Sequence, residues 1–198
     1  MNIQIRNAHT SDCASIATLH KELLPTSFLG RLSGRFLDLL YTELLCSNNG
    51  IVIVGEEQGR IVGFITGTVN TSQFYKYFLK RNFLSAGLLL LPYIIKKDVS
   101  TRIFETFTYG KKATSASLPE AELLSMAVGE TYQGRGVGQE LFAHLVEEYR
   151  RRGVNCFKVV VGDTLERANK FYLKVGCRKR GEYEVHRGEK SNVYVFEG

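Results

Sequence analysis

Apolar residues in the first seventy positions follow two periodicities, one typical of strands and one typical of helices. The stretch 3–6 alternates polar and apolar residues and predicts a strand. The runs 51–54 and 61–69, on either side of a Gln-Gly-Arg turn signal, predict a β-hairpin. Between these strands, apolar residues recur three or four positions apart and predict two helices, one with Ile16, Leu19 and Leu23 and one with Leu32, Phe36, Leu40 and Leu44.

The last eighty residues continue the alternation of strands and helices. Strands are predicted at 120–128 and 157–161, and the segments 178–185 and 191–196 predict a terminal antiparallel pair. Two amphipathic helices lie between them, with the stripes Val137, Leu141, Phe142, Leu145, Val146 and Leu165, Ala168, Tyr172, Val175. This mixed order predicts an α/β (α+β) fold in which helices cover a sheet.

Residues 72–117 interrupt this alternation and hold the excess positive charge. They contain eight basic and two acidic residues, whereas the whole chain has 26 and 20, so the remainder is neutral. Aromatic residues alternate with the basic ones, and the run 83–95 is almost entirely apolar. A transmembrane helix needs about 20 apolar residues. Because this run is shorter and contains Pro92, we expect two short helices that meet at Pro92.

Length and composition narrow the class of protein. A chain of 198 residues with 44% hydrophobic and 23% charged residues is typical of a globular protein and excludes a disordered or collagen-like chain. We predict one domain over 1–198, with a basic, helical insertion at 72–117. The four cysteines are widely spaced and form no C-x-x-C pair, so we expect no metal site. With no apolar leader at the start, we expect a cytoplasmic protein.

The sharpest motif is Gln133-Gly134-Arg135-Gly136-Val137-Gly138, between a predicted strand and a predicted helix. Glycines let the backbone approach a ligand closely, and the first turn of a helix presents unpaired N–H groups and a positive dipole. The unit is therefore suited to bind a phosphate or pyrophosphate. A tight turn that serves only packing is the other interpretation of the loop by itself.

Two other nucleotide-binding motifs do not fit this loop. A P-loop requires Gly-Lys followed by Ser or Thr, and the sequence has no such pair here. A dinucleotide-binding fingerprint, G-x-G-x-x-G, follows the first strand of a parallel unit, whereas this loop lies late in the chain and ends with the wrong spacing.

Residues 119–177 resemble the cofactor-binding core of the GNAT superfamily of acetyl-CoA-dependent N-acetyltransferases. The family's loop pattern, R/Q-x-x-G-x-G/A, is matched by Gln133, Gly136 and Gly138, and the segment 168–176 resembles the family's A-x-x-F/L-Y-x-x-x-G helix. Leu165 departs from the pattern, because many members have a cofactor-contacting Asn there. The resemblance implies a mixed, mostly antiparallel sheet with splayed central strands, and places 72–117 between the third and fourth strands.

The resemblance also implies how acetyl-CoA is held. The pantetheine arm would lie along the backbone of the fourth strand, and the pyrophosphate would rest on N–H groups of the loop and the first helical turn. The residues implied as cofactor contacts are Met126, Ala127, Val128, Gln133, Gly134, Arg135, Gly136, Val137, Gly138, Gln139 and Asn169. A backbone N–H near Met126 would stabilise the oxyanion of the tetrahedral intermediate.

Two residues are candidates for proton transfer. Tyr172 matches the family's general-acid tyrosine, which protonates the departing thiolate; a core aromatic is the alternative. Glu122 is the candidate general base, because strand periodicity places it on the face of Leu124 and Met126 and its distance before Gln133 resembles that in histone-acetylating members. A solvated strand-end Glu, with the amine deprotonated through water, is the alternative.

The predicted function is N-acetyl transfer from acetyl-CoA to the primary amine of a small molecule, such as an amino sugar or nucleotide-linked sugar, by direct attack. A protein N-terminal or lysine acetyltransferase and a non-catalytic acetyl-CoA-binding module are the alternatives. The basic insertion 72–117 stays open among a lid, a site for anionic substrates and a peripheral membrane contact. A homodimer also stays open. We expect no nucleic-acid partner, since no recognition motif is present.

Overall fold

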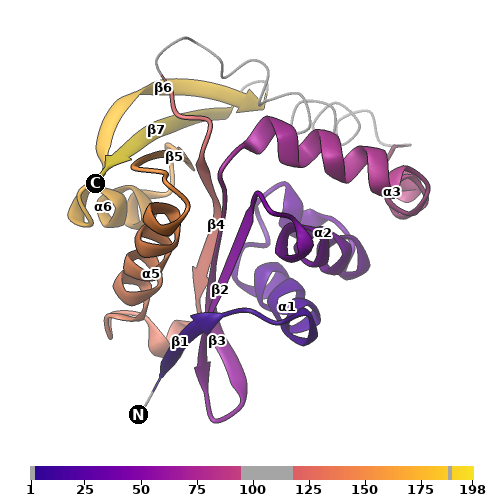
Figure 1. Cartoon of the computed structure of the whole chain (residues 1–198), viewed down its shortest axis with the longest axis horizontal. Coiled ribbons are helices and arrows are strands. Elements are labelled where there is room, and N and C mark those ends of the chain that lie inside the picture. Colours follow the sequence, from indigo (N-terminus) through magenta and orange to yellow (C-terminus); the bar gives the residue numbers. More distant parts are fainter. Residues whose placement is uncertain (1–2, 95–117, 187–188) are drawn as a thin grey trace.

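A seven-stranded sheet separates two layers of helices in the computed structural model, which describes residues 3–94, 118–186 and 189–198 (Figure 1). The strands are β1 (Gln4–Asn7), β2 (Gly50–Glu57), β3 (Arg60–Thr68), β4 (Glu122–Val128), β5 (Cys156–Gly162), β6 (Arg178–His186) and β7 (Glu189–Glu197). The helices are α1 (Cys13–Leu23), α2 (Gly34–Cys46), α3 (Thr71–Ile94), α5 (Val137–Arg151) and α6 (Glu166–Lys174), with short 3₁₀ turns at Thr10–Asp12, Leu29–Arg31 and Glu130–Tyr132.

The sheet is mixed and mostly antiparallel. Its strand order is β1-β2-β3-β4-β5-β7-β6. Every neighbouring pair is antiparallel except β4 and β5, which run parallel. The predicted fold class is thereby confirmed. The parallel pair in the middle of the sheet matters for the site, because it joins the two halves of the protein through very few paired residues.

Each face of the sheet has its own hydrophobic core. On one face α1, α2 and α3 pack over β2 and β3, around the buried rings of Phe36, Phe64 and Phe78 (Figure 1). On the other face α5 and α6 cover the strands, around Phe142 and Phe157. These apolar residues come from the stripes that the sequence predicts as helix and strand positions, so burial of those stripes determines which side of each element faces the sheet.

The insertion differs from the prediction. Its described part is one long element, α3, which starts at Thr71, and its break lies at Asn82 (φ −112°, ψ 20°) instead of Pro92. The Asn82 side chain donates to the Phe78 carbonyl at 3.3 Å and so competes for a backbone acceptor of the helix. Pro92 lies in the last turn of α3, near the end of the element, where a proline disturbs fewer backbone hydrogen bonds.

The remainder of the insertion, 95–117, lies outside the described residues.

The start of α3 is held by Asn70, whose side-chain oxygen accepts from the Gln73 N–H at 2.9 Å, which is N-terminal helix capping. Across the described ranges, none of the helices combines the length and the apolar character that crossing a bilayer would require.

Candidate functional site

A cleft opens where β4 and β5 separate. Only Glu122 with Lys158 and Leu123 with Val159 are paired, and beyond them the strands diverge. This is the predicted splay. The cleft has a volume of about 820 Å³ and is lined by Leu23, Leu24, Met126, Ala127, Val128, Gln133, Gly134, Gly136, Gly138, Gln139, Thr164, Leu165, Glu166, Arg167, Ala168, Phe171, Tyr172 and Lys174. Most predicted site residues therefore meet in one place, and those not on the lining are Glu122, Arg135, Val137 and Asn169.

Glycine is required at two positions of the loop. Gly134 and Gly136 have φ of +75° and +87°, a left-handed conformation that other residues rarely adopt. A Cβ on either would meet no atom within 4 Å, so the backbone here faces open space. Gln133 secures the loop, because its Nε2 donates to the Val128 carbonyl at 2.9 Å. The loop thus leaves room for a ligand beside its backbone.

The loop leads directly into the N-terminus of α5. Gly136 is the N-cap, and the first backbone hydrogen bond of the helix is donated by Gln139 to the Gly136 carbonyl at 2.9 Å. The N–H groups of Val137 and Gly138 precede that bond in the first turn, where helix N–H groups point outward and the dipole is positive. The arrangement fits an anion such as the pyrophosphate of a nucleotide.

Gly138 and its neighbours form the floor of the cleft. A Cβ on Gly138 would lie 3.0 Å from the Met126 methyl carbon and 3.5 Å from the Phe171 ring. The third glycine therefore allows α5 to pack closely against β4 and α6. Val137 is buried in the core, so it can offer only its backbone N–H to a ligand. Arg135 is exposed and lies outside the lining.

Asn169 holds the start of α6 in place. Its Nδ2 donates to the carbonyls of Gly162 and Leu165 at 2.9 and 2.8 Å, and its Oδ1 accepts from Asn192 and Tyr194 at 2.8 Å each. These bonds join the end of β5, the start of α6 and β7. The side chain that we expected to contact the cofactor therefore has internal partners in this structure, and it shapes the cleft by positioning α6.

Tyr172 reaches the cleft from α6 while most of its ring is buried. The ring packs near Phe142, Phe171 and Tyr194, with centroids 6.4, 5.3 and 6.2 Å away. Among the described residues, nothing hydrogen-bonds to its hydroxyl, which leaves that group available to a ligand. Burial raises the pKa of Tyr172 well above its usual value, so the phenol keeps its proton at neutral pH.

A β-bulge places Glu122 on a different face from Met126. The adjacent residues Thr66 and Gly67 of β3 pair with Ser125 and Leu123, so the intervening residue of β4 has no partner. Met126 packs in the α5 core, whereas Glu122 contacts Thr71 at the start of α3. The prediction that Glu122 shares a face with Met126 is wrong, because the bulge breaks the strand periodicity on which it rests. Leu124 packs against the core on the α1–α3 side.

Glu122 lies in a buried ion pair. Its Oε2 is 3.5 Å from Lys158 Nζ and accepts from Thr71 Oγ1 at 3.0 Å. Lys158 also donates to the Pro119 carbonyl at 2.6 Å. Burial raises the pKa of Glu122, and the nearby ammonium and hydroxyl groups offset part of that shift. The carboxylate thus has its own partners at the point where β4 and β5 still pair.

Sequence reasoning missed a polar network on the α1 and α2 face. His20 Nδ1 lies 2.5 Å from the Tyr41 hydroxyl. His20 Nε2 lies 3.2 Å from Ser27 Oγ, which donates to the Leu24 carbonyl at 2.7 Å. Burial lowers the pKa of His20 from 6.5 to about 4, so the ring is neutral at pH 7. No periodicity could reveal this network, because its members come from α1, α2 and the connection between them.

The comparisons with known proteins agree with this geometry. The model of the acetyltransferase (GNAT) family matches residues 16–177. The chain belongs to this family. The match includes the Gly-rich loop, the splayed strands and Tyr172, and it confirms the resemblance on which the predicted class of acyltransferase rests. Among curated proteins, none matches the sequence.

Solved structures share the fold at low sequence identity. The PaiA N-acetyltransferase of Thermoplasma acidophilum, solved with coenzyme A, has a TM-score of 0.64 and 11% identity over 100% of both chains. The ribosomal-protein-S18-alanine N-acetyltransferase of Escherichia coli has a TM-score of 0.62 and 15% identity, over 99% of this chain and 94% of that one. NAA60 of Arabidopsis thaliana, solved with acetyl-CoA, has a TM-score of 0.62 and 14% identity, over 99% of this chain and 98% of that one.

Potential metal ligands do not cluster in the part of the chain that the structure describes. There, no group of three or more His, Cys, Asp or Glu side chains is arranged to hold an ion. The four cysteines are all free, and Cys13 and Cys177 are buried.

Proposed function

We propose that this protein transfers the acetyl group of acetyl-CoA to the primary amine of a small molecule, with amino sugars and nucleotide-linked sugars as the first candidates. The observation that carries the proposal is the convergence of three features on one cleft. These are the glycine loop at the start of α5, the edge of β4 at 126–128 that β5 leaves unpaired, and Tyr172 of α6. Anion binding, strand pairing and proton donation are the three tasks that such a transfer needs.

The donor fits the residues present. Gly134 and Gly136 leave open space where the pyrophosphate would lie, and the N–H groups from Gly134 to Gln139 are proposed to bind it. The backbone of Met126, Ala127 and Val128 would pair with the pantetheine arm along the edge that β5 leaves free. Arg135, exposed beside the loop, would add positive charge, and Asn169 would keep α6 in position.

The transfer needs stabilisation of an oxyanion and movement of two protons. As the amine attacks, a C–N bond forms to the acetyl carbon, and a backbone N–H near Met126 is proposed to stabilise the oxyanion. When the C–S bond breaks, Tyr172 donates a hydrogen bond or its proton to the leaving sulfur. Because burial disfavours a phenolate at this position, we expect Tyr172 to recover its proton before the next cycle.

The proton of the amine leaves by one of two routes. Glu122 could accept it through intervening water, since its carboxylate does not line the cleft. Alternatively, water alone carries the proton away. We favour the second route, because Glu122 does not line the cleft and its carboxylate already contacts Lys158 and Thr71.

A protein acceptor is the second candidate. One of the similar structures, the E. coli enzyme, is an alanine N-acetyltransferase for a ribosomal protein. Another, NAA60, was also solved with a bisubstrate analogue. A module that binds acetyl-CoA without turnover is the third candidate, and Tyr172 on the lining of the cleft argues against it. Four free cysteines fit a cytoplasmic site of action, which we keep as part of the proposal.

Release of free thiol from acetyl-CoA tests these candidates directly. The purified chain would be incubated with amino sugars, nucleotide-linked amino sugars, polyamines and peptides with free N-termini. We expect saturable turnover with a small amine and no turnover with the peptides. Turnover with peptides alone would establish the protein acceptor. Binding of acetyl-CoA by calorimetry without any turnover would support the non-catalytic module instead.

A further inference from the structure

The solvent-exposed side of α3 changes character along the helix. Before the break at Asn82 it presents Lys76, Lys80 and Arg81, and after the break it presents large apolar side chains. Those side chains are Phe83, Leu84, Leu88 and Leu91, which are 73%, 82%, 69% and 54% exposed. We call these four residues the apolar face of α3.

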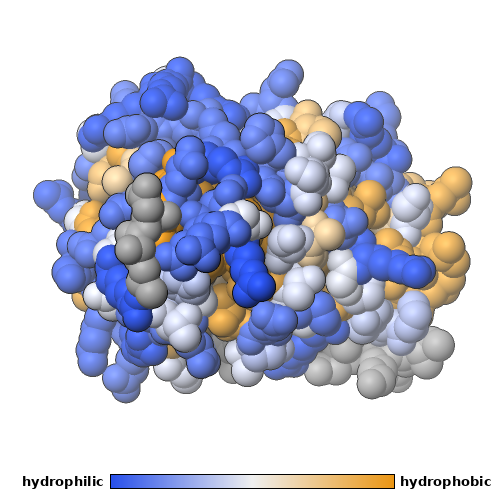
Figure 2. Space-filling model, turned by 90° about the horizontal axis from the view of Figure 1, so that it is seen from below, coloured by the Kyte–Doolittle hydropathy of each residue, from blue (hydrophilic) through white to orange (hydrophobic). Residues whose placement is uncertain are grey.

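Such exposure is concentrated on this helix. Among the described residues, the other large apolar side chains with comparable exposure are Tyr77, also on α3, and Leu165 and Leu173 near α6. Figure 2 shows hydrophobic side chains gathered at one end of the molecule, the end that α3 occupies in Figure 1. Contiguous apolar surface of this kind marks an interaction site in proteins that are otherwise well packed.

The opposite side of α3 is firmly packed, so the apolar face is not a core that failed to close. Phe74, Phe78, Ala86 and Leu90 are buried in the core that α3 shares with α2. The Phe36 and Phe78 rings meet edge to face at 5.9 Å. With these contacts in place, α3 cannot rotate to bury the leucines on its outer side without exposing an equal number of buried residues.

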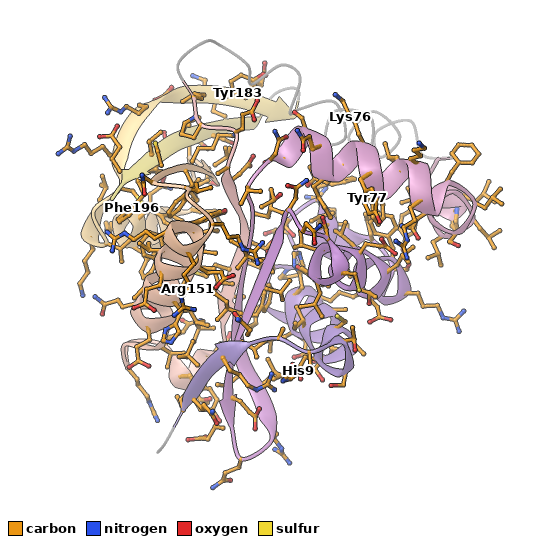
Figure 3. The ribbon with its side chains drawn as sticks, in the orientation of Figure 1. His9, Lys76, Tyr77, Arg151, Tyr183 and Phe196 are labelled. Atoms are coloured by element: carbon orange, nitrogen blue, oxygen red, sulfur yellow. The ribbon has the colours of Figure 1, made fainter. Side chains whose placement is uncertain are left out.

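The charge on α3 favours an anionic partner. The segment Thr71–Ile94 contains Lys76, Lys80 and Arg81 and no acidic residue. Lys76 extends from α3 into solvent (Figure 3), and Lys80 is exposed. Arg81 donates to the Tyr77 hydroxyl at 2.7 Å and lies 3.4 Å from Glu43 of α2, which holds this basic stretch against the body of the protein.

We propose that α3 docks on an anionic lipid surface, with the apolar face in the acyl–headgroup boundary and Lys76 and Lys80 near the lipid phosphates. An amphipathic helix that has basic residues beside an exposed apolar face lies in the plane of the interface in this way. No described helix is long and apolar enough to span the bilayer, so the contact is peripheral. The proposal does not depend on acetyl transfer.

Vesicle sedimentation with the full chain tests the surface. One set of vesicles is phosphatidylcholine alone, and the other is an equal mixture with phosphatidylglycerol. We expect binding to the anionic vesicles only, and weaker binding as salt screens the charges over about 10 Å at 0.1 M. Leu84→Gln with Leu88→Gln should lower the affinity about tenfold or more, and Lys76→Gln with Lys80→Gln about tenfold. Leu173→Gln, at a leucine of α6 that is 55% exposed, is the control and should bind as wild type.

Three outcomes would overturn the proposal. The first is no binding to anionic vesicles, or binding that the α3 variants leave unchanged. The second is that wild type is a dimer in sedimentation velocity whereas the leucine variant is a monomer, because the apolar face would then contact a second copy of the chain. The third is a clearly lower unfolding midpoint of the leucine variant than of Leu173→Gln, because other parts of the chain would then cover the face. Acetyl-CoA affinity, measured in parallel, should be the same in all variants.

Discussion

The two faces of the sheet are built differently. On the face of α5 and α6, a loop of glycines and the helix N-terminus that directly follows it form a cleft together with Tyr172 of α6. On the face of α1, α2 and α3, a buried histidine network joins distant elements, and an apolar helix surface faces solvent. The first face depends mainly on a motif that is local in sequence, whereas the second depends on contacts between different elements, so the sequence predicts the first face better than the second.

Loss of the Tyr172 hydroxyl should have the largest effect on the first face. Tyr172→Phe should lower kcat by roughly 10²- to 10⁴-fold, the usual contribution of a general acid, with little change in acetyl-CoA affinity. Steady-state kinetics and calorimetry measure the two quantities separately. Tyr149→Phe is the matched control, since Tyr149 is a buried tyrosine whose hydroxyl donates to the Glu122 carbonyl at 2.7 Å. It should cost about 1 kcal/mol of stability and leave kcat unchanged. Turnover of Tyr172→Phe within twofold of wild type would make Tyr172 a packing residue.

The ion pair where the strands part gives the next largest effect. Glu122→Gln leaves Lys158 buried without its counterion and should cost about 3–5 kcal/mol of stability, measured by denaturant unfolding. Adding Lys158→Met removes the stranded charge and should recover most of that stability. If water alone takes the proton from the amine, turnover and its pH profile recover as well. Persistent loss of turnover in the stable double variant would show that Glu122 is the base.

His20 should make the second face sensitive to acid. Its folded pKa of about 4 lies below the ordinary 6.5, so the unfolded chain binds a proton first as the pH falls. The contribution of His20 to the free energy of unfolding should therefore be fully present above pH 6.5. It should be lost progressively between pH 6.5 and 4, by up to about 3 kcal/mol. His20→Asn removes the titrating group, and its stability should vary less over this range in urea unfolding at a series of pH values. Parallel curves for the two proteins would contradict the buried, neutral His20.

These contrasts also explain what the sequence could predict. The order of elements follows from periodicity, the loop follows from a motif whose residues are close together in the chain, and the splay is implied by the resemblance to the GNAT superfamily. The bulge in β4 could not be predicted, because a single unpaired residue does not change the pattern of an apolar run. The bulge nevertheless turns Glu122 to a different face from Met126. The break at Asn82 could not be predicted either, since Pro92 is the stronger sequence signal for a helix break. The His20 network depends on distances between elements, which no pattern of residues records.

The smallest effect tests the glycine loop against a glycine of the same geometry elsewhere. Gly136 and Gly153 flank α5 with φ of +87° and +74°, and a Cβ on either would meet no atom within 4 Å. Gly136→Ala and Gly153→Ala should therefore lose similar stability, about 1–2 kcal/mol, because both force alanine into a left-handed conformation. Only Gly136 lines the cleft. Its Cβ would occupy the space proposed for the pyrophosphate, so acetyl-CoA affinity should fall about tenfold in Gly136→Ala, equivalent to about 1.4 kcal/mol. Calorimetry at equal fractions of folded protein measures this difference. Equal acetyl-CoA affinities in the two variants would show that the loop serves only the turn, and that the phosphates bind elsewhere on this face.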